Sequence, residues 1–475
     1  MADQRQGEAG SSSLESIVVH KNGANTPAAV SDDENQWLGF IVNGQSLKNQ
    51  QEVTSAKIER VPGMLRDVEE NSGCYDPLVV SIGPYHHGDP RLELMQQHKL
   101  TMARQYVNGD LKLLKELYQK VRSMAKAAKE CYADQSSVAK FSDEEFSKMM
   151  FLDACFLLQF IYCTAREERD ALKIKNNMIA LVQRDLILLE NQIPFQVLNE
   201  LSFKFGNENR KKTMLNKFVT QIRSLPPQSH KTNLKSFLGN VAFGKRKAAL
   251  DVEGIAGTFE SEPAHLLDLI RSSLFDKAVL TRQPPHDCSD WFSYRSAKEL
   301  KEVGIHFRPS KTNRFTDVDF KSGYLAGILK LPQIYIDDSS KSMLLNLVAY
   351  EFSPNGPDDF GISSYICLMD SLIDHAEDVK ELRKKGILLN FLGSDQQVAD
   401  LFNEIADNLV SHPNAYAVVK DGIEKHYKSR LKIWLAEWLH DHFNSPWTVL
   451  AFIGAILALV LSVLQTYESW GPSNC

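Results

Sequence analysis

The sequence lacks the patterns by which most catalytic sites are recognised. It has no phosphate-binding Gly loop, no HExxH, no Gly-x-Ser-x-Gly nucleophile turn, and no kinase or dinucleotide-binding set. Its seven cysteines are widely separated, except for Cys155 and Cys163 in one apolar stretch, so neither a disulfide framework nor a zinc site is indicated. Thiols in an apolar helix are buried and inert. We therefore expect no cofactor and no enzymatic activity.

A secretory signal is also missing. Residues 1–50 are polar and contain no apolar stretch of the required length, so we predict a disordered leader. The composition, 43% hydrophobic and 24% charged, is that of a globular protein with a substantial core. We therefore predict one helical domain over residues 51–443, and the unpaired cysteines favour a cytosolic location for it.

Charged side chains are absent from Phe443 to Tyr467. As a helix, the 21 residues from Trp447 to Tyr467 rise about 31 Å, which matches the hydrocarbon core of a bilayer. We predict one C-terminal transmembrane helix over residues 447–467, marked along its length by Trp447, Phe452, Leu457, Leu461 and Tyr467. The span has no ionisable side chain for a proton relay. A buried core helix is the alternative interpretation.

The flanks of this span predict its orientation. Lysines and arginines precede it, whereas Glu468 and a short tail, residues 468–475, follow it. Because positive flanks stay on the cytosolic side, we expect a cytosolic body and a single-pass, tail-anchored protein. The membrane would be the plasma membrane or an endomembrane.

A net charge of −6 conceals one basic region. The stretch from Lys204 to Lys247 contains eleven Lys and Arg residues and one acidic residue, Glu208. We predict an exposed basic insertion over about residues 203–260. A solvated loop and contact with the anionic membrane surface are both compatible with it, and nucleic acid is not expected. The side chains for lipid contact would be Lys211, Lys212, Lys245, Arg246 and Lys247.

Helical patterns dominate the predicted body. A stripe that includes Val107, Leu114 and Val121 predicts one amphipathic helix starting near Pro90. Residues 141–162 begin with a Ser-x-x-Glu capping box and are apolar nearly all round, which predicts a central helix. A third helix should run on until Pro194 breaks it, with nearby Asn and Gln side chains bonding the freed backbone groups.

Short strands interrupt the helices at about residues 304–338, in "IHFRP", "FTDVDFKSG" and "ILKLPQIYIDD". Helical patterns resume afterwards, including "GSDQQVADLFNEI" with its capping box. The predicted fold class is therefore mostly α (α+β): a multi-helix body with a small β element and one transmembrane helix.

Two groups of polar residues are weak candidates for a metal site. His86 and His87 are adjacent and diverge in either a strand or a turn, so with Asp89 they make a poor chelate. Asp337 and Asp338 have no spaced carboxylate set beside them. A turn held by imidazole hydrogen bonds, and a strand end followed by a helix cap, explain the two groups more simply.

Several stretches, kept in order from about residue 58 to 467, together resemble a plant-specific family. They include "IERVPGMLRD", "YDPLVVSIGPYHHGD", "MMFLDACFLLQF", "DLILLENQIPFQVL", "LPQIYIDD" and "NFLGSDQQVADLFN". The family is known as domain of unknown function 247, or uncharacterised protein family 0481. The resemblance implies a helical cytosolic body with one C-terminal span, and it implies no activity. Some similar proteins relate to self-incompatibility in grasses, which suggests recognition at a membrane.

Two functional hypotheses follow. The first is a non-enzymatic, membrane-anchored protein that binds other proteins, with self-association as one form of such binding, in signalling or recognition. The alternative is a metal-dependent hydrolase that uses the segment with His86, His87 and Asp89. It predicts that these residues converge in one polar pocket, either by themselves or together with Asp337 and Asp338.

Overall fold

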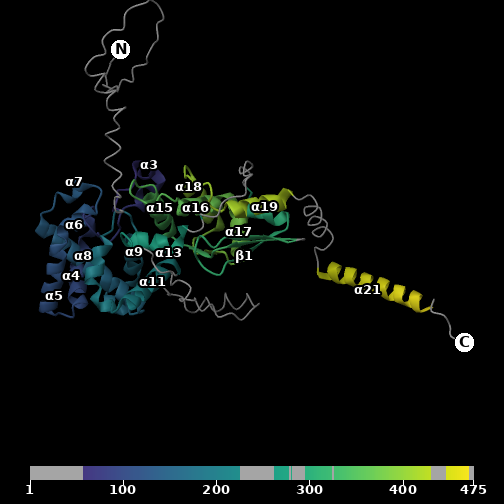
Figure 1. The fold of residues 1–475 in the computed structure, drawn as a ribbon, viewed down its shortest axis with the longest axis horizontal. Coiled ribbons are helices and arrows are strands. Elements are labelled where there is room, and N and C mark those ends of the chain that lie inside the picture. The colour runs from purple at the N-terminus through teal and green to yellow at the C-terminus, as the bar shows by residue number, and fades with distance from the viewer. Residues whose placement is uncertain are drawn as a thin grey trace, which may run out of the picture. The chain divides into compact units, whose positions relative to one another are not determined.

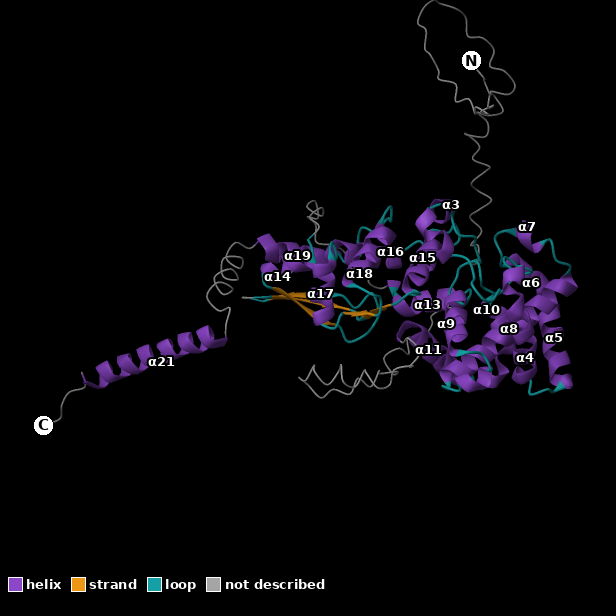
Figure 2. Cartoon of the chain, turned by 180° about the vertical axis from the view of Figure 1, so that it is seen from behind, coloured by secondary structure: helices purple, strands orange, loops and turns teal. Residues whose placement is uncertain are grey.

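The computed structural model describes residues 57–224, 262–277, 280, 295–323, 326–428 and 446–469. The predicted leader of residues 1–50 lies outside this part of the chain. Helices make up most of the described residues, and the strands form two small sheets (Figures 1 and 2).

The N-terminal half is helical. Its α-helices are α3 (Gly63–Arg66), α4 (Glu93–Tyr106), α5 (Leu111–Ser123), α6 (Ala125–Glu130), α7 (Gln135–Val138), α8 (Asp143–Ala165), α9 (Asn176–Asp185), α10 (Phe195–Leu201) and α11 (Glu208–Ser224). Four 3₁₀ turns accompany them: η1 (Glu69–Cys74), η2 (Pro90–Leu92), η3 (Arg169–Leu172) and η4 (Ser202–Phe205).

Helix α8 is the central helix of this half, as its sequence predicts. The capping box forms: Ser142 Oγ accepts from Glu145 N at 3.3 Å, and Ser142 N donates to Glu145 Oε2 at 3.0 Å. Helices α4, α5, α10 and α11 pack around α8. Its aromatic side chains Phe146, Phe156 and Phe160 are fully buried. Each contributes about 1.5–3 kcal/mol relative to an exposed position, so burial stabilises this helix more than propensity does.

The amphipathic stretch after Pro90 forms two helices, and the prediction of a single helix is wrong. Helix α4 ends at Tyr106, and Asn108 and Gly109 adopt left-handed backbone conformations with φ of 52° and 75°. Asp110 then caps α5 through its carboxylate. A non-glycine residue in this region is uncommon, which is why the break is hard to see in the apolar stripe.

The helix that we expect to continue to Pro194 ends earlier, at Asp185. A segment of turns follows before Pro194 caps α10. Its amide side chains do bond the freed backbone groups, as predicted. Asn191 and Gln192 donate to three carbonyl oxygens between Asp185 and Leu188. These bonds satisfy buried polar groups that no helix serves.

The basic region is only partly an insertion. Residues 208–224 form α11, which packs against α8 with Leu215, Phe218 and Val219 buried. These three side chains share one helix face, so α11 belongs to the core. The prediction of an exposed insertion is therefore wrong for this helix, and residues 225–261 lie outside the described part of the chain.

The C-terminal half mixes helices and strands. Its helices are α13 (Leu266–Leu274), α14 (Ala297–Glu302), α15 (Ser340–Glu351), α16 (Gly361–Leu372), α17 (Ala376–Lys384), α18 (Asp395–Ala406), α19 (Ala417–Lys428) and α21 (Pro446–Ser469). Its strands are β1 (Ile305–Pro309), β2 (Asp319–Ser322), β3 (Gly327–Leu331), β4 (Ile334–Ile336) and β5 (Leu388–Asn390).

The predicted strands form, and the sheets are small. Strand β3 lies between β1, which is parallel to it, and β2, which is antiparallel. Strand β4 pairs in parallel with β5, a three-residue strand that the sequence pattern does not predict. Helices α14 and α19 contact the first sheet and α17 contacts β5, so the strands (orange in Figure 2) lie among these helices.

Candidate functional site

The three residues of the candidate metal segment contact three different partners. His86 Nε2 lies 3.8 Å from Glu190 Oε2, and the His87 ring packs edge-to-face on Phe141 at a centroid distance of 5.5 Å. Asp89 caps η2, where its carboxylate accepts from Arg91 N at 2.9 Å. Their side chains therefore do not converge on one point.

The second candidate group forms the turn before a helix. Asp337 Oδ1 accepts from Ser339 N at 3.0 Å and from Ser340 Oγ at 2.9 Å, between β4 and α15, whereas Asp338 is exposed. Among all described residues, no three His, Cys, Asp or Glu side chains lie close enough together to hold a metal ion. The metal-site hypothesis has no geometric support in this part of the chain.

His86 instead lines a polar pocket of about 390 Å³. Its lining residues are Arg60, Val61, Arg66, Asp76, Tyr85, His86 and Glu190. They come from "IERVPGMLRD", "YDPLVVSIGPYHHGD" and "DLILLENQIPFQVL", three of the stretches on which the family resemblance rests. Sequence reasoning selected only His86 among them. The one hint in the sequence is that all seven lining residues belong to stretches that carry the family resemblance. The spacing of these stretches does not indicate that residues 60 and 190 meet.

Glu190 is the centre of this pocket and is 3% exposed. Its Oε1 accepts from Val61 N at 2.9 Å, and its Oε2 accepts from Arg60 Nη1 at 2.8 Å. Arg66 Nη2 lies 3.0 Å from Oε1, and Arg66 Nη1 bonds Asp76 Oδ1 at the same distance. Burial alone would lower the pKa of Arg66, but Glu190 and Asp76 raise it overall. One buried carboxylate thus holds two guanidinium groups.

Arg60 has three partners besides Glu190, although its side chain is 40% exposed. Its guanidinium lies 4.1 Å from the centroid of the Tyr85 ring, and it donates to Ser137 Oγ at 2.8 Å and Asp134 Oδ2 at 3.3 Å. Hydrogen bonds from Ser136 and Ser137, supplemented by Arg60, hold the pKa of Asp134 well below its usual value. Asp134 is therefore ionised at any physiological pH.

His86 contributes an imidazole to the pocket wall. Burial lowers the pKa of its imidazole, and this effect outweighs the attraction of Glu190, so the ring is neutral at pH 7. Its Nε2 is buried and has no hydrogen-bond partner within the described residues.

Buried groups fix the backbone behind the pocket. The carboxylate of Asp185 accepts from three successive N–H groups, Leu78 to Val80, at 2.7 to 3.0 Å. Asp153 Oδ2 accepts from Gly83 N at 2.8 Å, and Gly83 has a φ of +78° with no room for a side chain, since a Cβ would meet Gln192 O at 2.5 Å. The loop that carries Tyr85 and His86 is therefore held in one conformation.

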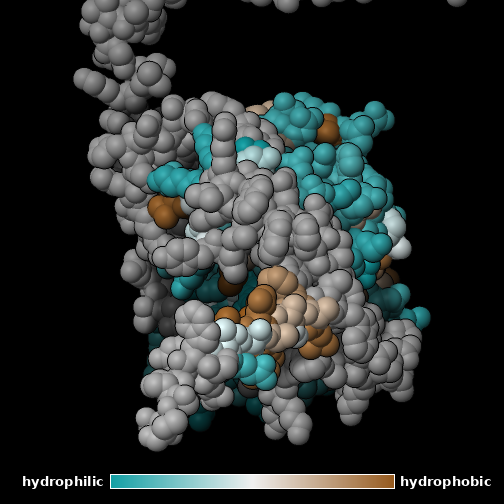
Figure 3. All heavy atoms as spheres, turned by 90° about the vertical axis from the view of Figure 1, so that its right-hand side faces the viewer, coloured by the Kyte–Doolittle hydropathy of each residue, from teal (hydrophilic) through white to brown (hydrophobic). Residues whose placement is uncertain are grey.

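Helix α21 is the second candidate surface. Its described side chains, Leu450–Thr466, are all exposed and none is charged, including Phe452, Leu457 and Leu461. They give the brown and tan cluster low in the view of Figure 3. The side chains of Trp447 and Tyr467 lie outside the described residues. Among the described helices, α8 has the length and composition of a membrane span, but 83% of its apolar window is buried in the protein.

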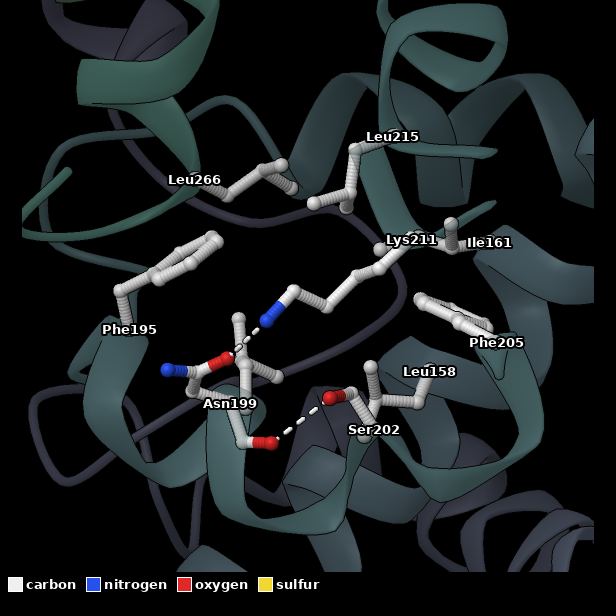
Figure 4. A pocket seen from close by; sticks show the side chains of 10 residues that line it. Leu158, Ile161, Phe195, Asn199, Ser202, Phe205, Lys211, Leu215 and Leu266 are labelled. Atoms are coloured by element: carbon white, nitrogen blue, oxygen red, sulfur yellow. Dashed lines mark hydrogen bonds between the residues drawn. The ribbon is translucent and has the colours of Figure 1, made fainter. Parts of the chain in front are cut away.

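Lys211, one of the predicted lipid contacts, points inward. It lines a small, mostly apolar cavity of about 10 Å³, and its Nζ donates to Asn199 Oδ1 (Figure 4). It also pairs with Glu208 at 2.8 Å. A buried amine with two partners cannot reach a membrane surface without leaving them. Lys212 is half-buried, and Lys245, Arg246 and Lys247 lie outside the described residues.

Comparisons with known proteins agree on one family. The model of DUF247, described as a plant protein of unknown function, matches residues 58–461. The UPF0481 protein At3g47200 of Arabidopsis thaliana is 30% identical over 448 residues, covering 87% of this chain and 86% of the relative. The putative UPF0481 protein At3g02645 from the same plant is 26% identical, covering 92% and 95%. No solved structure matches the chain significantly. The chain therefore belongs to the DUF247 family of plant proteins, whose function is unknown.

Proposed function

We propose that this chain is a membrane-tethered interaction protein, in which the span 447–467 holds a partner-binding helical body against a bilayer. The observation that carries the proposal is α21, a helix whose described side chains are exposed, uncharged and mostly apolar. Soluble proteins seldom leave a contiguous apolar surface of this extent in water. Lipid is the environment in which such a surface is stable.

Length and composition support insertion. Helix α21 has 24 residues, which rise about 36 Å, enough to cross a hydrocarbon core of about 30 Å. Ten of the residues from Leu450 to Thr466 are Leu, Ile, Val or Phe. At about −0.3 to −0.6 kcal/mol each, they favour transfer into the bilayer by about 3 to 6 kcal/mol. Gly454, Ser462 and Gln465 reduce this value.

Helix α8 is the contrasting case. It has 23 residues and is apolar enough to cross a membrane, yet helices of the body cover it, so its apolar side chains already have partners. Burial therefore separates a core helix from a candidate span when composition does not.

The orientation that we propose places the body on the cytosolic side. Lys420, Lys425 and Lys428 of α19 come before the span, together with Arg430 and Lys432 in the chain. Positive residues close to a span favour the side that is not translocated. The plasma membrane and an endomembrane both fit this orientation.

The partner-binding role rests on the surface around the polar pocket. Met64 and Leu78 are 62% and 51% exposed, and they belong to the same two segments that supply Arg66 and Asp76 to the pocket. Exposed apolar side chains beside arginine and tyrosine are the composition of protein interfaces. A second copy of this chain is one partner that such a surface could accept.

Proximity labelling in plant cells tests the proposal. The full chain should label a reproducible set of membrane-associated proteins, and replacing both Met64 and Leu78 by Asp should remove part of that set. The matched control replaces Leu94 and Leu100, 65% and 59% exposed on α4, in the same way. Equal labelling by the two double variants, or a purified monomer with no reproducible partner, would contradict a binding role for this surface.

A further inference from the structure

We propose that the polar pocket around Glu190 binds a neutral, hydroxyl-rich small molecule, a sugar or a cyclitol. The inference concerns the pocket alone and stands whether or not α21 enters a membrane. It assigns a ligand class to Arg66, Asp76, His86 and Glu190, beyond the interaction role proposed above.

The pocket has the size and construction of a ligand site. Its volume of about 390 Å³ falls in the range of roughly 300–1,000 Å³ that small-molecule sites occupy. Three chain segments line it, and hydrogen bonds to Asp185 and Asp153 fix the backbone of one of them. A site that is fixed before binding loses little conformational entropy when a ligand arrives.

Charge balance argues against an ionic ligand. Arg60 and Arg66 are cationic, Asp76 and Glu190 are anionic, and His86 is neutral, so the lining carries no net charge. A phosphate or carboxylate would meet the negative charges of Asp76 and Glu190, which already neutralise the two guanidinium groups. A cation would meet the same guanidinium groups. A neutral ligand meets neither repulsion.

The arrangement of donors and acceptors fits hydroxyl groups. Arg66 Nη1 and Asp76 Oδ1 lie side by side at 3.0 Å, and their side chains are 30% and 42% exposed, so both face solvent. A hydroxyl has one donor and two acceptor lone pairs, so it can donate to the carboxylate and accept from the guanidinium. Neighbouring hydroxyls of a ring can do both at once, and hydrogen bonds to charged groups are the stronger ones.

Titration of the full chain with D-glucose, D-mannose, D-galactose and myo-inositol tests the inference. The protein is kept in a detergent without a sugar headgroup, and binding is measured by calorimetry and by saturation-transfer NMR. We expect at least one of these compounds to bind at millimolar concentration or better. Preference for a hexose would assign a sugar, and preference for myo-inositol would assign a cyclitol; both outcomes support the pocket's ligand class.

Two variants connect binding to the pocket. Asp76→Asn keeps the size of the side chain and removes its negative charge. Arg66→Lys keeps the positive charge and removes the planar guanidinium group with its paired N–H donors. Each should weaken binding about tenfold. The matched control is Asp319→Asn, because Asp319 is 44% exposed and pairs with Lys330 on β3. Thermal unfolding identifies any variant that fails to fold, and the unaltered chain is tested in parallel with phosphate, acetate and guanidinium.

Three results would overturn the inference. The first is that none of the four compounds binds at tens of millimolar. The second is that an ionic probe binds more tightly than every polyol. The third is that the folded Asp76→Asn and Asp319→Asn variants bind the polyol with equal affinity.

Discussion

At the scale of single residues, two aspartates of α8 pair with lysines in opposite surroundings. Asp153 and Lys99 are 1% and 0% exposed, and Lys99 also donates to Ser81 O. Asp143 and Lys129 form a pair of similar length, 2.7 Å, but the Asp143 side chain is 83% exposed. Burial decides how much each pair matters, because a cation left alone in the core keeps its desolvation cost.

We therefore predict that Asp153→Asn lowers the free energy of unfolding by about 3–5 kcal/mol. Asp143→Asn should change it by less than about 1 kcal/mol, since water screens the exposed pair. Urea unfolding of both variants measures the difference. Similar losses in the two variants would contradict the view that burial decides the value of these pairs.

A third carboxyl predicts a pH dependence. Burial, with Asp374 and Asp407 nearby, raises the pKa of Asp370 to about 6. A raised carboxyl pKa means that the folded state binds a proton that the unfolded state, with a pKa of about 3.9, releases. The contribution of Asp370 is therefore unfavourable at pH 7, and it disappears as the pH falls through 6 toward 4.

Asp370→Asn should then stabilise the protein at pH 7 by about 1 kcal/mol, a value that allows for screening by solvent. At pH 4 the variant and the parent chain should have the same stability. Denaturant unfolding at several pH values measures this. A constant difference across the range would show that Asp370 does not titrate there.

At the scale of elements, a side-chain amide joins two segments whose backbones form no hydrogen bonds with each other through a helix or a sheet. Asn191 Oδ1 accepts from Ile82 N at 2.6 Å, and its Nδ2 donates to Val80 O at 3.0 Å and Asp185 O at 2.9 Å. This one residue connects the turn after α9 to the loop that carries the polar pocket. No helix or strand supplies these bonds.

Asn191→Ala should cost about 3 kcal/mol of stability, because it leaves buried backbone groups unsatisfied. The control is Asn403→Ala, since Asn403 makes one exposed bond, to Asp374 O at 3.3 Å, and should cost less than about 1 kcal/mol. Thermal unfolding compares the two. Equal costs would contradict the joining role of Asn191.

Helix α21 carries the prediction about membrane insertion. Leu457 lies near its middle and Thr466 near its end. An arginine costs about 2.5–3.5 kcal/mol at the centre of a span, and less near the end, where its side chain reaches the headgroups. Leu457→Arg should therefore reduce insertion into microsomes strongly, and Thr466→Arg only slightly. Equal insertion of the two variants would argue against a transmembrane position.

At the scale of the whole molecule, local signals in the sequence predicted local structure well. The capping boxes at Ser142 and Ser394 form, the strands of β1 to β4 appear near the expected positions, and the apolar residues of α8 are buried. Each of these features depends on residues close together in the chain. A three-residue strand such as β5, or a break at Asn108, leaves too weak a pattern to detect.

The polar pocket is the opposite case. Arg60 and Glu190 are 130 positions apart, so their ion pair forms only when the chain folds and the two segments meet. Hydrophobic periodicity describes which face of an element is buried, and it does not describe which loops meet. The sequence pattern places His86 in a metal site with His87 and Asp89. In the structure, His86 shares a pocket with Glu190, Arg60 and Arg66 instead.

The central claim is that α21 lies in lipid and tethers the body to a membrane. Carbonate extraction of membranes from plant cells that express the full chain tests it most directly, with a chain that stops before Pro446 as control. Our account predicts that the full chain stays in the membrane pellet and that the shortened chain is released. Release of the full chain into the supernatant would contradict it.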